Sequence, residues 1–307
     1  MKASGRFLRS KKGDSEGIVF SVRAQLPRSV LRALSPRREG LPSFRKPPVN
    51  EVVLGVSFKP LTRLRITDLG HLQAALAENY PTLEEHPPYY PPIEQFGPTG
   101  FAASLSVDLT VMDWPRLWFL SLDNERLVQF QRNWLAFNWR KISPGSEYQR
   151  WQAVRESFVS AFLALDTVVH SATDENVVPL QCEVSYINEI GISDLGITAG
   201  QLWRVLRVAC PTPEGSLPTP EQMALQLQYP MADGEQTVGR LHLTTQPAKR
   251  RKDGSDVLVI NLTARGRPNS SNLDGVLAFL DLASERIVDS FGALTTDEMH
   301  DIWEQEN

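Results

Sequence analysis

The chain has 307 residues, of which 41% are hydrophobic and 22% are charged, and its formal net charge is -4. This is the composition of a globular protein, long enough for one large domain or two small ones. No apolar run approaches the roughly 18 residues of a membrane helix, and the N-terminus lacks the apolar stretch of a secretory signal, so we expect a cytoplasmic protein.

Residues 1–46 form a basic leader. The leader holds twelve lysines and arginines against three acidic residues, a charge of about +9, so the remainder carries about -13. Glycine, serine and proline interrupt it, and we predict that it is disordered. It is either a solvated tail, the interpretation we favour, or an arm that contacts nucleic acid. Because it lacks the interleaved aromatic residues of single-strand binders, we expect weak nucleic-acid binding through this segment alone.

The elements of a first half-unit are predicted over residues 47–175. Apolar and β-branched residues predict a strand, leucines at helical spacing after Asp68 predict a helix, and five prolines exclude regular structure over 87–100. The expected order is a strand at 51–58, a helix after Asp68 that stops before Pro81, the proline-rich connection, strands at 116–122 and 126–132, and a helix at 147–167.

The same order recurs over residues 176–307. The expected elements are a strand at 181–190, a short helix at 198–208, a proline-rich connection at 211–220, strands at 223–229, 239–246 and 257–264, and a helix at 273–291. The repetition indicates a pseudo-duplication. Adjacent hairpins favour antiparallel pairing. We therefore predict one α+β module, a curved and mainly antiparallel sheet with both long helices on one side and an open face on the other.

Several short phrases carry a resemblance to a known family. They are residues 47–56 (PPVNEVVLGV), 129–132 (QFQR), 137–141 (FNWRK), 183–188 (EVSYIN), 261–266 (NLTARG) and 294–303 (LTTDEMHDIW). From residue 47 to the end, the chain resembles a sporadically distributed, uncharacterised bacterial protein family. The resemblance implies a bacterial protein built as a single module, and it brings no catalytic residues with it.

No common catalytic motif is present. The sequence has no phosphate-binding Gly-rich loop, no nucleophile elbow and no His-Glu-x-x-His zinc motif. Cys182 and Cys210 have no other Cys or His at the spacing of metal ligands, and they are interpreted as buried thiols. The five histidines, one in each region, are His71, His86, His170, His242 and His300. Because a readable metal site needs clustered ligands, we expect no metal and no cofactor.

The last three predicted strands have one polar side. Alternation places Leu241, Leu243 and Leu262 on the apolar side, and amides, hydroxyls, two arginines and a histidine on the other. The polar set is Gln226, Gln228, Arg240, His242, Thr244, Gln246, Asn261, Thr263 and Arg265. A merely solvated sheet collects more Lys and Glu. This face is therefore a candidate for recognition by hydrogen bonding, with a solvated or self-paired sheet face as the alternative.

Three other groups of residues invite a functional interpretation. Trp139 and Arg140, next to Asn138, can together stack on or clamp a planar or anionic ligand, although a core tryptophan with an arginine beside it is the favoured interpretation. Glu183 and Glu189 share one strand face and can support acid/base chemistry, but solvated glutamates are commoner. Asn188 is interpreted as a structural residue that bonds backbone.

These observations favour a non-enzymatic binding or adaptor protein. The candidate ligand-binding residues are Arg240, His242, Gln246, Asn261, Thr263, Arg265, Asn138 and Arg140. The expected ligand is a protein partner, with the product of a neighbouring gene as the first candidate, or a small polar molecule. The alternative is an enzyme acting on an anionic substrate, with His242 as general base and Arg240 and Arg265 holding the substrate.

Overall fold

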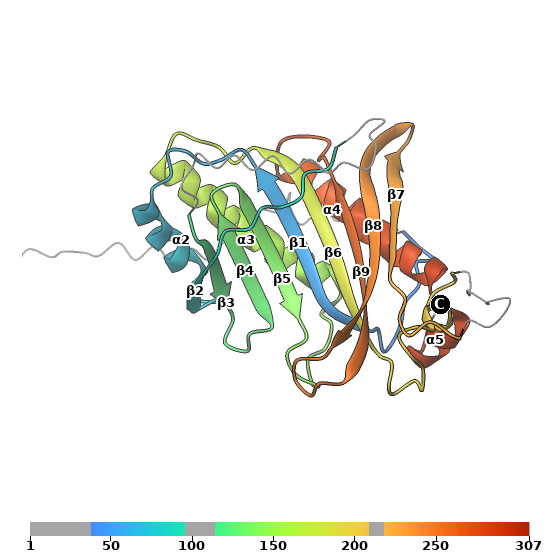
Figure 1. The fold of residues 1–307 in the computed structure, drawn as a ribbon. Coiled ribbons are helices and arrows are strands. Elements are labelled where there is room, and N and C mark those ends of the chain that lie inside the picture. Colours follow the sequence, from blue (N-terminus) through green and yellow to red (C-terminus); the bar gives the residue numbers. More distant parts are fainter. Residues whose placement is uncertain (1–37, 96–113, 209–217, 307) are drawn as a thin grey trace, which may run out of the picture.

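The structure is a computed structural model that describes residues 38–95, 114–208 and 218–306 (Figure 1). The strands are β1 (Val49–Phe58), β2 (Thr82–His86), β3 (Arg116–Leu120), β4 (Arg126–Gln131), β5 (Trp134–Arg140), β6 (Pro179–Gly191), β7 (Leu225–Asp233), β8 (Gln236–Lys249) and β9 (Asp256–Gly266). The helices are η1 (Ile66–Asp68), α2 (Leu69–Leu76), α3 (Arg150–Ala172), η2 (Leu202–Arg204), α4 (Leu273–Leu294) and α5 (Asp297–Ile302).

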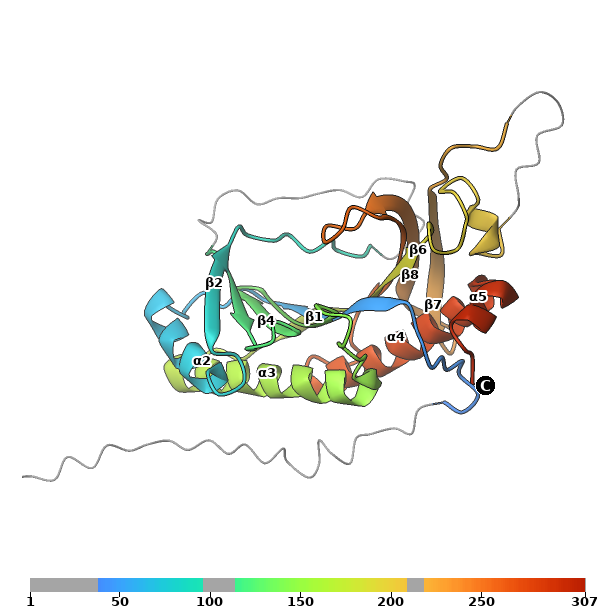
Figure 2. The same cartoon turned by 90° about the horizontal axis from the view of Figure 1, so that it is seen from below.

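All nine strands belong to one sheet, in the order β2-β3-β4-β5-β1-β6-β9-β8-β7. Every neighbouring pair is antiparallel. Figure 2 shows α3 and α4 on one side of the sheet. The predicted α+β class, the antiparallel sheet and the common side of the two long helices are therefore confirmed.

The core lies between the sheet and these two helices. In the central strand β1, Val52, Leu54 and Val56 are fully buried, because alternate residues of a strand point to the same face. α3 packs on β5 and β1, and α4 packs on β6 and β9. Phe158 of α3 and Leu280 of α4 are also fully buried. The apolar stripe of each helix thus covers one half of the sheet.

Two strands and one helix were not predicted. All residues of β5 except Arg140 are buried, so its sequence lacks the alternation that marks a half-buried strand. The edge strand β2 is exposed along most of its length and therefore also lacks an apolar period. The third missed element is α5, which has only six residues.

The predicted helix at 198–208 is wrong. This segment has one 3-10 turn, η2, whose neighbours Val205 and Leu206 are buried. The backbone of Pro220 passes so close to Gly200 that an added Cβ would lie 1.5 Å from the Pro220 carbonyl oxygen. The apolar spacing therefore reflects a buried turn. This turn is too short for its hydrogen bonds to offset the free-energy cost of nucleating a regular helix.

Folded structure starts before residue 47. Phe44 is buried against Phe291 and Trp303, and the amides of Arg45 and Lys46 bond to the carbonyls of Glu304 and Trp303. Residues 38–46 thus belong to the folded body, and the boundary of the predicted leader needs correction. Residues 1–37, which carry the rest of the leader prediction, lie outside the described residues, as do Cys210 and most of the second proline-rich connection.

Within the described part of the chain, no helix combines the length and the apolar character needed to cross a bilayer.

Candidate functional site

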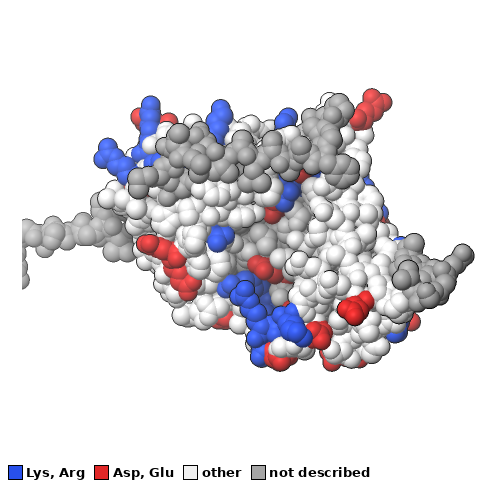
Figure 3. Space-filling view, viewed as in Figure 1, with Lys and Arg blue, Asp and Glu red and all other residues white. Residues whose placement is uncertain are grey.

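The face of the sheet opposite α3 and α4 carries the predicted polar side chains. Arg240 of β8 pairs with Arg265 of β9, and His242 pairs with Thr263. The two rows continue onto β6, where Glu183 and Ser185 stand opposite Arg265 and Thr263. The predicted alternation is therefore confirmed for β8 and β9, whereas in β7 Tyr229, predicted on the apolar side, is exposed. In Figure 3, much of the visible surface over these strands carries neither Lys, Arg, Asp nor Glu.

One segment of the chain runs over this open face. We call residues 87–95 the crossing segment; it follows β2 in Figure 1, and Figure 2 shows it on the side opposite the long helices. The side-chain amide of Gln131 accepts a hydrogen bond from the Tyr89 amide (2.8 Å) and donates one to the Tyr89 carbonyl (3.0 Å). Gln181 accepts from the Glu94 amide (2.7 Å) and donates to the Pro92 carbonyl (2.8 Å). Two glutamines of the sheet therefore hold the main chain of the crossing segment.

The crossing segment delivers a carboxylate to the two arginines and the histidine. Glu94 accepts hydrogen bonds from Arg240 and from His242 Nε2, the latter at 2.8 Å, and Arg265 Nη1 lies 3.8 Å from Glu94 Oε2. We call Arg240, His242 and Arg265 the anion cluster. Its side chains are between 13% and 22% exposed, and that of Glu94 is 6% exposed. Because these four side chains are largely shielded from water, the ionic contacts between them are stronger than contacts at an open surface.

The surroundings of Glu94 favour its charged form. Burial by itself would raise the pKa of this carboxyl group, but the hydrogen bonds and charges of His242 and Arg240 outweigh burial and lower the pKa below its usual value. Glu94 is therefore ionised at neutral pH and acts as an anionic ligand from within the chain.

The pH dependence of this contact can be measured. A carboxylate whose pKa is lowered by folding stabilises the protein above its unfolded pKa, about 4.3, and loses this contribution as the pH falls through the folded value. Glu94→Gln should therefore lower the free energy of unfolding by roughly 1–3 kcal/mol at pH 7, and by much less at pH 3. Urea denaturation at both pH values measures the difference. Glu85→Gln, on the exposed edge strand β2, is the control, and an equal loss at pH 7 and pH 3 would contradict the assignment.

The other predicted residues of this face lie beside the cluster and do not contact Glu94. Thr263 Oγ1 is 2.7 Å from Ser185 Oγ and donates to Asn261 Oδ1 at 3.2 Å. Gln246 lies further along β8 and is exposed. Thr263 and Asn261 thus form a hydroxyl and amide chain that extends the polar face away from the anion cluster.

Asn138 and Arg140 lie on the same face but far from the cluster. Asn138 shares a cross-strand row with Thr263 and His242, with β1 and β6 between. The step from β5 to β8 covers four strand spacings, roughly 19 Å. Asn138 accepts from Gln129 and donates to Glu51, and Arg140 donates to the Asn124 carbonyl. The structure does not bring these two residues to the anion cluster.

The two glutamates of β6 do not form a carboxylate pair. Glu183 Oε2 accepts from Arg265 Nε at 2.6 Å, and Glu189 Oε1 accepts from Arg250 Nε at 2.6 Å. They are six residues apart on an extended strand, so about 20 Å separates them. Each carboxylate has its own arginine, and the arrangement gives no support to acid/base catalysis by the two together.

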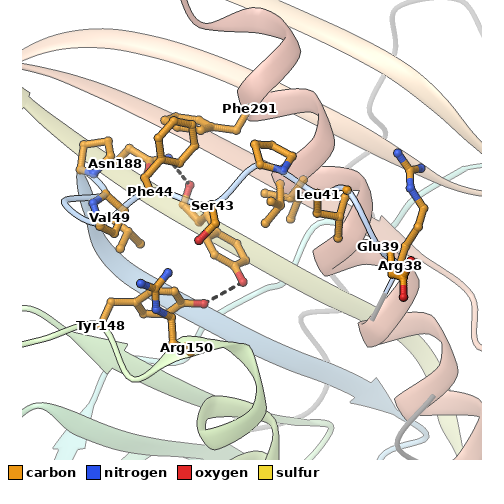
Figure 4. A pocket seen from close by; sticks show the side chains of 17 residues that line it. Arg38, Glu39, Leu41, Ser43, Phe44, Val49, Tyr148, Arg150, Asn188 and Phe291 are labelled. Carbon is orange, nitrogen blue, oxygen red and sulfur yellow. Dashed lines mark hydrogen bonds between the residues drawn. The ribbon is translucent and has the colours of Figure 1, made fainter. Parts of the chain in front are cut away.

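A cavity of about 390 Å³ lies on the other side of the sheet, between residues 38–49 and α4 (Figure 4). Tyr148 and Tyr186, whose hydroxyls are 3.0 Å apart, line it, and the Tyr186 hydroxyl is 3.2 Å from that of Ser284. Asn188, also on its wall, donates to the Ile260 carbonyl, as its structural interpretation predicts. The side chains of Tyr148, Tyr186 and Asn188 on this wall thus have hydrogen-bond partners within the chain.

The described residues contain no group of three or more His, Cys, Asp or Glu side chains that could hold a metal ion. Cys182 is fully buried as a free thiol, and burial raises its pKa far above the usual range. It is therefore a core residue and a poor nucleophile.

Sequence reasoning missed Glu94, Gln131 and Gln181. Glu94 lies in a proline-rich connection with no period, and 146 residues separate it from Arg240. The one local signal was a lone acidic residue after four prolines and two tyrosines. Gln131 and Gln181 are buried polar residues of strands. Because buried polar groups need hydrogen-bond partners, such residues indicate that another segment of polar backbone covers this face of the sheet.

Fold and site together define an α+β protein with one helix-covered face and an anion cluster on the other face of its sheet. Comparisons of the chain with protein-family models, with curated proteins and with solved structures found no match. The resemblance to an uncharacterised bacterial family therefore stays a prediction, and function has to be argued from the site.

Proposed function

We propose that this chain is a non-enzymatic binding protein that recognises an anionic group of a partner on the open face of its sheet. The observation that supports the proposal is the convergence of Arg240, His242 and Arg265 on one carboxylate. Charge-assisted hydrogen bonds of this kind are about twice as strong as neutral ones. The neighbouring hydroxyls and amides of Thr263 and Asn261 add hydrogen-bonding groups that a partner can use.

Arg240 offers the sharpest test of this proposal. Unlike Arg265, which also bonds Glu183, Arg240 projects from β8 toward the crossing segment, so its replacement disturbs the sheet least. Arg240→Gln should reduce the amount of captured partner about tenfold, since a hydrogen bond to a charged group contributes roughly 1.5–3 kcal/mol. Affinity capture with the full chain, quantified by mass spectrometry, measures it.

A matched control removes the same charge elsewhere. Arg251→Gln lies in the exposed turn between β8 and β9 and should capture the same partners as the native chain. If Arg240→Gln and Arg251→Gln capture the same proteins in the same amounts, the open face is not the recognition surface.

The alternative function is an enzyme with His242 as general base and an anionic substrate held by Arg240 and Arg265. Its support is the contact of the His242 ring with a carboxylate, an arrangement used to orient catalytic histidines. Among the described contacts of this ring there is no nucleophilic hydroxyl or thiol, so the binding function is better supported.

The division into two half-units, 47–175 and 176–307, is part of the proposal. Its support is the strand order: β1 and β6 are adjacent at the centre, and the later strands of each half follow outward in reverse chain order. A long helix follows the strands of each half, and both long helices lie on the same side of the sheet. Two such halves would give the open face two related ends, of which the second carries the anion cluster.

A further inference from the structure

The crossing segment contacts the sheet as a bound peptide would. Its main chain is bonded at Tyr89, Pro92 and Glu94 by Gln131 and Gln181, contacts that require an extended peptide but no particular side chain. These two glutamines belong to one cross-strand row that runs from β4 through β5 and β1 to β6. The two glutamines at the ends of this row can therefore hydrogen-bond the main chain of a segment that runs perpendicular to the strands.

Two side chains of the crossing segment point into the sheet. The Tyr89 ring lies 5.0 Å from the ring of Trp134 and 5.6 Å from the guanidinium of Arg116, measured between ring centroids and from the centroid to Cζ. Five residues later, Glu94 enters the anion cluster. Between them, Tyr90 is 48% exposed and Ile93 is 76% exposed. The sheet therefore contacts an aromatic ring and a carboxylate five positions apart, while Tyr90 is about half exposed and the Ile93 side chain lies largely in solvent.

From these contacts we infer that the partner binds through an extended acidic peptide with an aromatic residue five positions before a carboxylate, and that the crossing segment occupies this site until the partner displaces it. The inference rests on the proposed function, and it adds the class of ligand and an internal competitor. A segment of the same chain acts at an effective concentration of about millimolar. A partner peptide must therefore outcompete Tyr89 and Glu94.

A fluorescein-labelled peptide with the sequence of residues 87–95 tests the inference. We expect it to bind the full-length double variant Tyr89→Ala, Glu94→Gln at least about tenfold more tightly than the native chain, because the variant weakens the internal competitor and leaves the sheet intact. Fluorescence polarisation gives both affinities. Ile93→Ala, which changes an exposed side chain of the same segment, should bind the peptide as weakly as the native chain does.

The specificity of the site is tested with altered peptides. A peptide with Gln in place of the acidic residue, or with Ala in place of the first tyrosine, should bind the double variant at least about fivefold more weakly. Equal binding of all three peptides, or no binding by a double variant that is folded by circular dichroism, overturns the inference. Either result leaves the Arg240→Gln capture experiment unaffected, so the two proposals can fail separately.

Hydrogen exchange on the native chain answers the question if the double variant does not fold. Excess peptide should speed the exchange of the Tyr89 and Glu94 amides, which lose Gln131 and Gln181 as acceptors when the crossing segment is displaced. Unchanged exchange of both amides with the peptide in millimolar excess would show that the crossing segment is a permanent part of the fold.

Discussion

Replacing Asp281 by alanine should lower the free energy of unfolding by about 3–5 kcal/mol. Asp281 of α4 accepts hydrogen bonds from Arg155 Nε and Trp151 Nε1 of α3, both at 2.9 Å, and Arg155 is only 3% exposed. Without the carboxylate, the buried guanidinium and the indole N–H both lose this acceptor. Denaturant unfolding of the full chain measures the loss.

Asp289→Ala is the matched control for this prediction. It lies on the same helix, but its partner Arg38 is 51% exposed and Asp289 itself 42%, so its removal should change stability by at most about 1 kcal/mol. An apolar pair, Arg155→Met with Asp281→Leu, should recover most of the stability lost in Asp281→Ala, because no buried charge is then left unpaired. If Asp281→Ala and Asp289→Ala are equally stable, the ion pair does not join the two helices.

Trp139→Ala should also cost about 3–5 kcal/mol, the range for removing a large aromatic side chain from a core. The Trp139 ring is fully buried on the helix side of β5 and packs against Tyr148, with 5.3 Å between ring centroids. The next residue, Arg140, points to the open face and donates to the Asn124 carbonyl at 2.8 Å. Arg140→Ala should therefore cost about 1 kcal/mol.

Chemical denaturation of the two variants decides between the two interpretations of this segment. A large loss for Trp139→Ala and a small one for Arg140→Ala agrees with a core tryptophan beside a surface arginine. Similar, small losses for both would mean that Trp139 is not a core residue, and would return the ligand-clamp interpretation of Trp139 and Arg140 to consideration.

The residues of the anion cluster could be predicted from the sequence, but the carboxylate that they bind could not. Arg240, His242, Thr263 and Arg265 alternate with leucine and alanine, and the strict two-residue period of a strand assigns them to one face without any tertiary information. Their carboxylate partner could not be predicted. Glu94 belongs to a connection without regular structure, and the local sequence of such a proline-rich segment does not predict where the segment crosses the sheet.

The sequence by itself therefore determined the features that depend on residues close together along the chain. The period of two over 239–246 and 257–264 and the apolar spacing in α4 follow from the local geometry of strands and helices, and they predict the α+β class and the polar face. The tertiary structure decided the rest. It covered both faces of β5, which erased the period of that strand, and it packed residues 38–46 against the C-terminal segment. It also placed Glu94 between Arg240 and His242, because the free energy of a contact depends on distance in space, which a local pattern does not contain.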